Sequence, residues 1–354
     1  MKNLKLFAPF LLAASVLAAC GDDTDVKTGS AEEDFEITVG LSQSSGGTLV
    51  DIAYQEGYFE DENLTVNRVG FANSADGLNA LQAGKVDVGV SFGTAGPLTF
   101  IANGSDFSII GGHLEGGHPI LTKNENAGQY TSLESYKGKK VGTIRIFTSD
   151  IVFRSALDDA GIDWKNEVEI VEFKTGSMLL EAVASGKVDV AVSANSFYAQ
   201  AIDMGLEAVA WSNDLQEGHV CCRVVTRTDL LSDHDGEAFK RFLKALIRAE
   251  RIKGENPQVA VAAAKEYMKV DESVITTIVN DPHSNYSSDP SKEKVEQMWE
   301  QMKEIGYVEN VDDININDYV NIDLYEQALN ELIEEHPDDS YYQKQLVRFN
   351  EQNI

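Results

Sequence analysis

The segments LNALQAGKVDVGV (78–90) and LEAVASGKVDVAV (180–192) are two copies of one pattern, 102 positions apart. Further pairs at the same spacing are Val39-Gly40 and Val141-Gly142, Val66 and Val168, Val69 and Val171, and Phe71 and Phe173. So many matches at one spacing are not expected by chance. A period of this length indicates duplicated lobes rather than a solenoid of short repeats. We therefore predict two lobes that are built alike.

Each half of the repeat has the pattern strand, helix, strand, helix, strand. In the first half, apolar strands are predicted over 36–41 and 64–71. The helix through Leu78 and Leu81 ends at Gly84, a residue suited to a left-handed C-cap. The following VDVGV has the apolar character of a short, buried parallel strand. The second half repeats this order with strands over 139–145, 168–173 and 188–192. Such alternation predicts α/β lobes with right-handed crossovers, in which ligands bind at the carboxyl ends of the strands.

The start of the chain has the features of a targeting segment. Lys2 and Lys5 precede an apolar run over 6–19, which is short for a membrane span. The run ends in LAACG (17–21), which resembles the lipobox of bacterial lipoproteins. This resemblance implies a signal peptide over 1–19 and lipid attachment to Cys20, which would anchor the chain without spanning the membrane. The alternative is an ordinary secretory signal with a chance cysteine. Residues 20–35 are rich in acids and predict a disordered tether.

The composition restricts the classes of partner. The chain has 354 residues and a net charge of −29, from 58 acidic and 29 basic residues. Such a charge argues against nucleic acid and against anionic lipid surfaces as partners. It suits an exported protein in a salty or alkaline medium. The length that remains after the leader is enough for two lobes with separate cores.

Two segments are predicted to connect the lobes. GGHPILTK (116–123) leaves the first lobe, and HVCCRVVTR (219–227) leaves the second. Because these segments also differ by about 102 positions, we interpret them as equivalent hinge strands that run close together. The first lobe then comprises 36–118 and about 224–354, including helices after Asp235 that complete and brace the lobes. The second lobe comprises 119–223.

Several segments together resemble a known family. They are IAYQEGYFEDENLTV (52–66), the paired GKVDV segments, SFGTAGPLTFIANG (91–104) and ALIRAERIKGENPQVAVAAAKEY (245–267). They resemble the substrate-binding proteins of ABC importers, in the branch for nitrate, sulfonate, taurine and thiamine-pyrimidine precursors. The resemblance implies an α/β class II periplasmic-binding-protein fold, with two lobes and two hinge strands. It also implies a monomer on the outer face of the cell membrane that closes around a small molecule and delivers it to the transmembrane subunit of an ABC permease. Neither catalysis nor a cofactor is expected.

The loops that follow strands are the first candidates for ligand contact. Free N–H groups and hydroxyls at helix starts bind anions or carbonyl oxygens, although simple N-capping also explains Ser and Thr at these places. The candidates are Ser44, Ser45, Thr48, Ser91, Gly93, Thr94, Thr148, Ser193 and Asn195. Aromatic residues of the same loops would stack on a ring or belong to the core; they are Phe92, Phe147, Phe197 and Tyr198.

Arg145 and the hinge residues are the other candidates. Arg145 would pair with a carboxylate, sulfonate or phosphate, or else with an acid on the surface. His118 lies in the first hinge segment. In an extended second segment, side chains alternate, so His219, Cys221 and Arg223 are predicted to share one face and Cys222 the other. We expect His118, His219, Cys221 and Arg223 to line the pocket.

The adjacent cysteines leave several interpretations open. No ligand spacing supports a structural zinc site, and none of the candidates is assigned to a metal. A vicinal disulfide fits an oxidising exterior but would distort a hinge strand. A nucleophile would need a base and an oxyanion site. Small, soft side chains would also pack well in a hinge.

The expected cargo is a small anion of the nitrate or sulfonate type, or a heteroaromatic vitamin precursor such as a pyrimidine or a flavin. One alternative is an enzyme that resembles the pyrimidine synthases, to whose cysteine-rich motif HVCCR is a partial likeness. The other is a surface adhesin.

Overall fold

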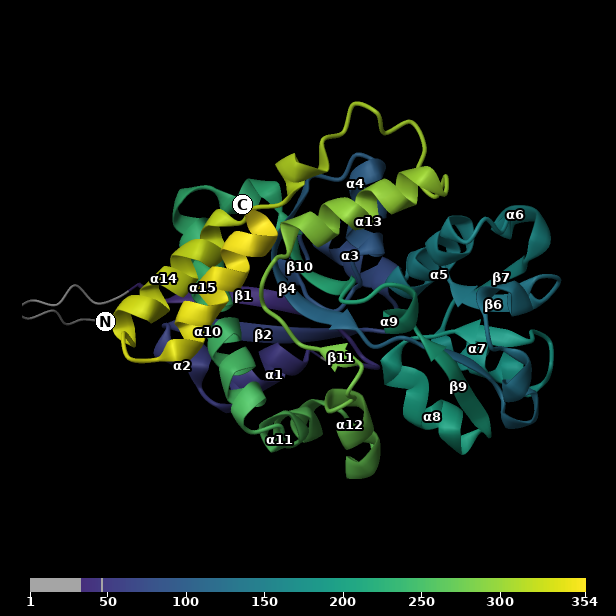
Figure 1. Ribbon diagram of the computed structural model, residues 1–354. Coiled ribbons are helices and arrows are strands. Elements are labelled where there is room, and N and C mark those ends of the chain that lie inside the picture. Colours follow the sequence, from purple (N-terminus) through teal and green to yellow (C-terminus); the bar gives the residue numbers. More distant parts are fainter. Residues whose placement is uncertain (1–32, 46) are drawn as a thin grey trace, which may run out of the picture. The chain divides into compact units, whose positions relative to one another are not determined.

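The computed structural model describes residues 33–45 and 47–354, and residues 34–354 form one unit with two β-sheets and their flanking helices (Figure 1). The predicted signal peptide, Cys20 and nearly all of the predicted tether lie outside the described residues. Within the described part of the chain, none of the helices combines the length and the apolar character that crossing a membrane requires.

The first lobe is built on a six-stranded sheet with the order β11-β4-β10-β3-β1-β2. Its strands are β1 (Phe35–Ser42), β2 (Leu64–Phe71), β3 (Val88–Gly89), β4 (Phe107–Gly116), β10 (Val220–Arg227) and β11 (Ser284–Asn285). Its first helices are α1 (Thr48–Gln55), α2 (Tyr58–Asp61), α3 (Ser74–Gln82) and α4 (Ala95–Ala102). Strands β2, β1 and β3 are parallel, and β10 runs antiparallel to β3.

The second lobe is built on a five-stranded sheet with the order β7-β6-β8-β5-β9. Its strands are β5 (Pro119–Lys123), β6 (Lys140–Ile144), β7 (Glu169–Phe173), β8 (Val190–Val192) and β9 (Leu206–Trp211). Its helices are α5 (Thr148–Asp159), α6 (Trp164–Glu167), α7 (Gly176–Ala184), α8 (Tyr198–Asp203) and α9 (Ser212–Leu215). Here β7, β6 and β8 are parallel and β5 runs antiparallel to β8, so five strands follow the same order as in the first sheet.

The repeat in the sequence corresponds to a repeated contact in the structure. Asp87 accepts a hydrogen bond from the backbone N–H of Thr38 at 2.8 Å. Asp189 accepts the equivalent bond from the N–H of Lys140, also at 2.8 Å. Each aspartate also donates its own N–H to the carbonyl of the same partner. The GKVDV segment therefore ties β3 to β1 in the first lobe and β8 to β6 in the second. Gly84, with a φ of 67°, ends the preceding helix as predicted.

The chain crosses between the sheets at two places. The outgoing crossing is the short turn between β4 and β5 at 117–118, and the returning one spans 212–219. Strand β10 belongs wholly to the first sheet, so the predicted lobe boundary at residue 223 lies inside a strand. Strands β5 and β10 are nevertheless equivalent, because each enters its sheet antiparallel to the strand of the GKVDV segment.

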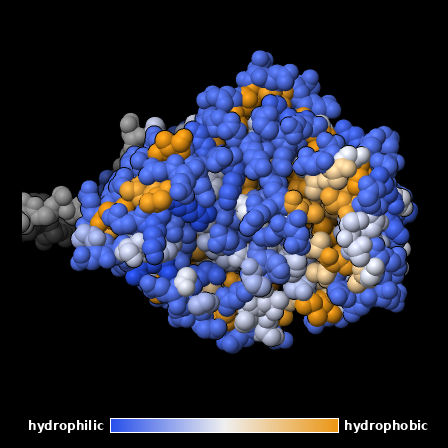
Figure 2. All heavy atoms as spheres, in the orientation of Figure 1, coloured by the Kyte–Doolittle hydropathy of each residue, from blue (hydrophilic) through white to orange (hydrophobic). Residues whose placement is uncertain are grey.

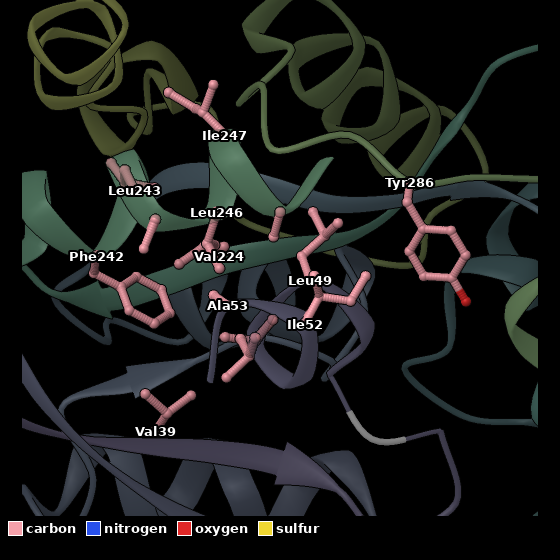
Figure 3. Packing of buried hydrophobic residues seen from close by; sticks show 14 of the residues in the cluster. Val39, Leu49, Ile52, Ala53, Val224, Phe242, Leu243, Leu246, Ile247 and Tyr286 are labelled. Carbon is pink, nitrogen blue, oxygen red and sulfur yellow. The ribbon is translucent and has the colours of Figure 1, made fainter. Parts of the chain in front are cut away.

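The C-terminal helices pack mainly on the first lobe (Figure 1). They are α10 (Asp233–Glu255), α11 (Gln258–Tyr267), α12 (Glu272–Val279), α13 (Lys292–Glu304), α14 (Asp323–Glu335) and α15 (Ser340–Asn353). Short 3₁₀ turns lie at Asn124–Gln129, Leu133–Tyr136, Asn195–Phe197, Thr228–Leu231 and Ile316–Tyr319. On one face of the first sheet, α1 and α10 bury Leu49, Ile52, Phe242 and Leu246 against Val39 and Val224 (Figure 3). On the other face, Trp299 of α13 is buried with residues of α3 and α4.

The face of the molecule in Figure 2 is mostly hydrophilic, with hydrophobic residues gathered over the second lobe. This surface agrees with the large excess of acidic residues in the sequence.

Candidate functional site

A cavity lies between the two lobes and is open to solvent in part. From the first lobe it is lined by Ser42, Ser44, Ser45, Ala72, Asn73, Ser74, Ser91, Gly93, His113, Leu114, Cys221, Cys222 and Tyr286. From the second lobe it is lined by Ile144, Phe147, Thr148, Lys174, Thr175, Gly176, Ala194, Asn195, Ser196 and Phe197, and His118 lines it from the outgoing crossing. Most of these residues follow the carboxyl ends of parallel strands, where ligands bind in α/β sheets.

The charge of this lining differs from that of the chain as a whole. Among the described residues that line the cavity there is no aspartate or glutamate, although the chain has 58 acidic residues. Lys174 contributes an ammonium group, and most of the other polar groups are hydroxyls and amides. Such a lining favours a ligand that is neutral or negatively charged.

Aromatic rings form part of the walls. Phe147 and Phe197 line the cavity from the second lobe. Tyr286 lies at the edge of the aliphatic core of the first lobe, with its hydroxyl directed away from the core side chains (Figure 3). Burial raises the pKa of Tyr286, so its hydroxyl stays protonated and can donate a hydrogen bond. Flat walls with a few polar groups are typical of sites that bind ring compounds.

Two imidazoles supply polar groups that have no protein partner. His113 of β4 and His118 are both buried, and the Nδ1 atom of each has no hydrogen-bond partner among the described residues. Burial lowers the pKa of each to about 3, so both rings are neutral near pH 7. A neutral imidazole has one donor and one acceptor nitrogen, and a buried polar atom without a partner is costly.

The carbonyl of Cys221 links both lobes to the hinge region. It accepts hydrogen bonds from the hydroxyls of Thr94, in the first lobe, and Thr148, in the second, each at 2.9 Å. The Thr148 hydroxyl in turn accepts the N–H of Thr94 at 3.1 Å and that of Ala95 at 3.4 Å. We call these groups of Thr94, Thr148 and Cys221 the hinge clamp. They place the start of α5 against the start of α4, at one end of the cavity.

The cysteine pair departs from the predicted alternation. Strand β10 shifts register against β4 between Val220 and Cys222 and again between Cys222 and Arg223. Because of these irregularities, both Cys221 and Cys222 line the cavity, and the prediction that they point to opposite sides is wrong. Both are free thiols, with their Sγ atoms 3.2 Å apart, and the Cys221 Sγ lies 3.0 Å from Nε2 of His118.

Arg223 lies behind the cavity rather than in its lining. Its side chain is fully buried and donates hydrogen bonds to the carbonyls of Cys222, Leu114 and Asp289 at 2.8–2.9 Å and to that of Pro290 at 3.3 Å. These bonds join β10 to β4 and to the loop before α13. The strand irregularity that brings Cys222 to the cavity also turns Arg223 away from it.

Arg145 lies beside the cavity rather than in it. Its side chain is 70% exposed, and its nearest acid is Glu172 at 3.9 Å. It lines a neighbouring surface hollow, which shares Asn73, Ser74, Ile144, Phe147 and Lys174 with the cavity. An exposed arginine at this distance holds no ligand in the main cavity by itself.

The structure brings together eight of the predicted ligand contacts in the cavity lining: Ser44, Ser45, Ser91, Gly93, His118, Thr148, Asn195 and Cys221. Four others are buried close by: Thr48 at the start of α1, Thr94 in the hinge clamp, Ser193 under the lining, and His219, whose ring is hydrogen-bonded to Ser212. Of the aromatic candidates, Phe92 is buried in the core and Tyr198 packs on Trp211.

Sequence reasoning missed the loop that follows β2 in the first lobe and the loop that follows β7 in the second. These loops contribute Asn73 and Ser74 in the first lobe and Lys174 and Thr175 in the second. Asn73 and Thr175 also cap their helices in the same way. Because Asn73 and Thr175 lie 102 positions apart, at the spacing of the repeat, the repeat itself was the signal that could have found these two loops. His113 could have been suspected as a polar residue in an otherwise apolar strand.

Metal ligation finds no support in this site. Within the part of the chain that the structure describes, no group of three or more His, Cys, Asp or Glu residues is arranged to hold a metal ion.

Comparisons with known proteins extend these observations. The model of the NMT1-like family matches residues 30–266. A protein of Brucella abortus that is named a binding protein is 25% identical over 254 residues, which cover 69% of this chain and 75% of that protein. The 4-amino-5-hydroxymethyl-2-methylpyrimidine phosphate synthase of Candida albicans is 25% identical over 225 residues, or 60% of this chain and 65% of the synthase.

Solved structures share the two-lobed architecture. The periplasmic nitrate-binding protein of Synechocystis superposes with a TM-score of 0.72 at 16% identity, over 85% of this chain and 89% of that one. The periplasmic aliphatic sulphonate-binding protein of Escherichia coli superposes with a TM-score of 0.67 at 17% identity, over 83% and 99%. These likenesses confirm the predicted periplasmic-binding-protein fold.

Proposed function

The chain belongs to the NMT1-like family, and we propose that it is an extracytoplasmic substrate-binding protein that delivers a small molecule to an ABC permease. The observation that carries this proposal is the cavity between the lobes, which both lobes and the outgoing crossing line. In this fold a ligand stabilises the closed arrangement through contacts that it makes with both lobes at once. The relatives that are named binding proteins support the same conclusion.

The cargo that fits the cavity best is a heteroaromatic compound with neutral polar or anionic substituents. Phe147 and Phe197 offer faces for a ring, and the hydroxyls and amides of the lining, such as those of Ser91 and Asn195, offer hydrogen bonds to ring nitrogens or exocyclic groups. Lys174 can pair with an anionic substituent. A single nitrate ion would satisfy only a few of these groups and would leave the aromatic walls without contact.

Membrane attachment through Cys20 completes the proposal. The LAACG sequence at 17–21 supports lipid attachment at this cysteine, and the acidic residues that follow it would act as a flexible tether. A monomer held in this way would stay beside its permease while its lobes open and close.

Binding is favoured over catalysis. The pyrimidine phosphate synthase is one relative of this chain. The proteins of three Brucella species that also match this chain are named as binding proteins. A delivery protein releases its cargo unchanged. No observation on this chain favours an adhesin.

Isothermal titration calorimetry tests the cargo class. The panel contains nitrate, alkanesulfonates, aminopyrimidines, pyrimidine phosphates and flavins. We expect one ring compound to bind at a stoichiometry of one and to be recovered unaltered. Tight binding of nitrate with no binding of any ring compound would contradict the proposed cargo. Chemical conversion of a bound compound would contradict the receptor function.

A matched pair of variants tests the location of binding. Ser196→Asp places a carboxylate in the cavity lining, and Ser132→Asp places one on the surface of the same lobe. At about 5 Å and an effective dielectric constant of about 20, repulsion between unit charges costs about 3 kcal/mol. An anionic cargo should therefore bind about a hundredfold more weakly to Ser196→Asp and normally to Ser132→Asp. Equal affinities of an anionic cargo for the two variants would place that cargo outside this cavity.

A further inference from the structure

We propose that Cys221 and Cys222 form a site of reversible oxidation, in which a small disulfide molecule that enters the cavity converts the two thiols into a vicinal disulfide and thereby opens the hinge clamp. The two Sγ atoms are 3.2 Å apart, and both residues line the cavity, which gives a small molecule access to them. The chemistry of the thiols does not depend on the identity of the cargo.

The backbone at this site is already irregular. The register of β10 against β4 shifts on both sides of Cys222, and these shifts bring both thiols to the same side of the strand. In a regular strand the two side chains would point to opposite faces and could not meet. The local conformation therefore removes the main geometric obstacle to a bond between neighbouring cysteines.

The groups around the pair suit thiol–disulfide exchange. Cys222 accepts hydrogen bonds from the Cys221 thiol and from the N–H of Gly93, which lower its pKa, whereas burial raises the pKa of Cys221. Cys222 is therefore the attacking thiolate. Nε2 of the neutral His118 ring lies 3.0 Å from the Cys221 Sγ and holds this sulfur in place beside Cys222.

The reaction balances in two steps. The Cys222 thiolate attacks one sulfur of the small disulfide, and the other half leaves as a thiolate. The thiolate that left in the first step takes the proton of the Cys221 thiol, and the Cys221 sulfur then attacks the Cys222 sulfur of the mixed disulfide and expels the second half. The pair loses two electrons and two protons, and the small disulfide gains them and becomes two thiols.

The peptide group that joins the two cysteines is also part of the hinge clamp. Neighbouring Cα atoms lie about 3.8 Å apart across a trans peptide, which is closer than the usual separation in disulfides, so closing the ring strains this peptide group. Its carbonyl is the atom that accepts the hydroxyls of Thr94 and Thr148. Oxidation that turns this carbonyl releases both bonds and loosens the start of α4 from the start of α5.

Strain also makes the bond readily reversible. A strained disulfide has a more oxidising potential and is reduced more easily than a structural one. The pair is therefore suited to switching rather than to permanent stabilisation of the fold. Regular exposure to disulfides rests on the proposed extracytoplasmic location, where thiols meet an oxidising medium.

Peptide mass spectrometry of the full chain tests the oxidation. Cleavage after Lys187 and Arg223 gives a tryptic peptide, 188–223, that contains both cysteines of the pair and no other. The folded protein is equilibrated in glutathione buffers, from fully reduced to fully oxidised, and then alkylated. We expect the peptide to carry two alkylated thiols in reducing buffer and none in oxidising buffer. The oxidised peptide should be lighter by two hydrogen atoms than the same peptide with two free, unalkylated thiols. Two free thiols at every ratio, or a stable glutathione adduct in place of the ring, would overturn the proposal.

A matched pair of variants tests the link to the clamp. Thr94→Val removes a hydroxyl that the dithiol form uses, whereas Thr99→Val removes one that bonds Ala95 within the same helix. Loss of one net hydrogen bond from the dithiol form should raise the equilibrium constant for ring formation about fivefold in Thr94→Val. The constant should stay unchanged in Thr99→Val. Equal constants in the two variants would show that the clamp and the thiol pair are independent.

Hydrogen exchange on the unmodified chain gives a readout that needs no variant. The N–H groups of Thr94 and Ala95 donate to the Thr148 hydroxyl, so both should exchange faster in the oxidised protein than in the reduced one. Unchanged protection after complete oxidation would refute release of the clamp. Because none of these measurements uses cargo, their failure would leave the proposed function standing, and failure of the cargo screen would leave the thiol chemistry standing.

Discussion

Replacement of Arg223 by methionine should destabilise the fold rather than merely weaken ligand binding. The side chain is fully buried, and three of its hydrogen bonds to backbone carbonyls measure 2.8–2.9 Å. Methionine nearly keeps the volume but offers no donor. Each carbonyl left without a partner costs about 1 kcal/mol or more, and the buried carboxylate of Glu115 loses a nearby positive charge. Together these losses lower the free energy of unfolding by about 4 kcal/mol.

Arg145→Met is the matched control, because it removes the same group from a side chain that is 70% exposed and 3.9 Å from its nearest acid. An exposed contact of this kind is worth less than about 0.5 kcal/mol. Urea denaturation at pH 7 measures both variants. If Arg223→Met lost no more stability than Arg145→Met, the structural role of Arg223 would be refuted, and a role in ligand binding would have to be reconsidered.

Three further predictions concern the core, the buried histidines and the cavity wall. Gly77→Ala should lower the free energy of unfolding by about 1–3 kcal/mol, because a Cβ there would lie 2.2 Å from the ring of Phe92, whereas Gly128→Ala, with no atom within 4 Å, should be neutral in urea denaturation. His118 has a folded pKa of about 3, below the unfolded value of 6.5. Its contribution to stability is therefore present above pH 6.5 and is lost as the pH falls towards 3. Between pH 7 and pH 5 this imidazole should lower the free energy of unfolding by about 2 kcal/mol. Over the same pH range, His118→Gln should therefore lose about 2 kcal/mol less stability than the unmodified chain, as measured by urea denaturation. Equal losses of stability would show that burial does not hold this imidazole neutral. Phe147→Ala should weaken a ring cargo about tenfold by calorimetry, and an unchanged affinity would remove this ring from the site.

The repeat made most of the fold predictable from the sequence. The strand 64–71 coincides with β2, and the helix that was expected through Leu78 and Leu81 is α3. Repeated strands and helices must build repeated lobes, so the order of elements followed from local patterns. The residue at which β10 begins did not follow from local patterns, because this boundary depends on pairing with β4, a strand about a hundred residues away.

The candidate site was predictable where it depends on the carboxyl ends of strands. Ser44, Ser91 and Asn195 follow strands and line the cavity. The orientation of Cys222 and Arg223 was not predictable, because side chains do not alternate strictly between the two faces of an irregular strand. No residue type in HVCCRVV indicates where the register shifts occur. Tyr286 was missed because it comes from a segment far along the chain that is brought to the cavity only by the packing of β11 beside β4.

Native mass spectrometry of the protein purified from its own cells tests the central claim most directly. The account predicts a complex heavier than the chain by one small organic molecule, and an anionic molecule is lost from Ser196→Asp and retained by Ser132→Asp. A chain that carries no small molecule under any growth condition, or an anionic molecule that both variants retain equally, would contradict the claim that the cavity between the lobes is the binding site.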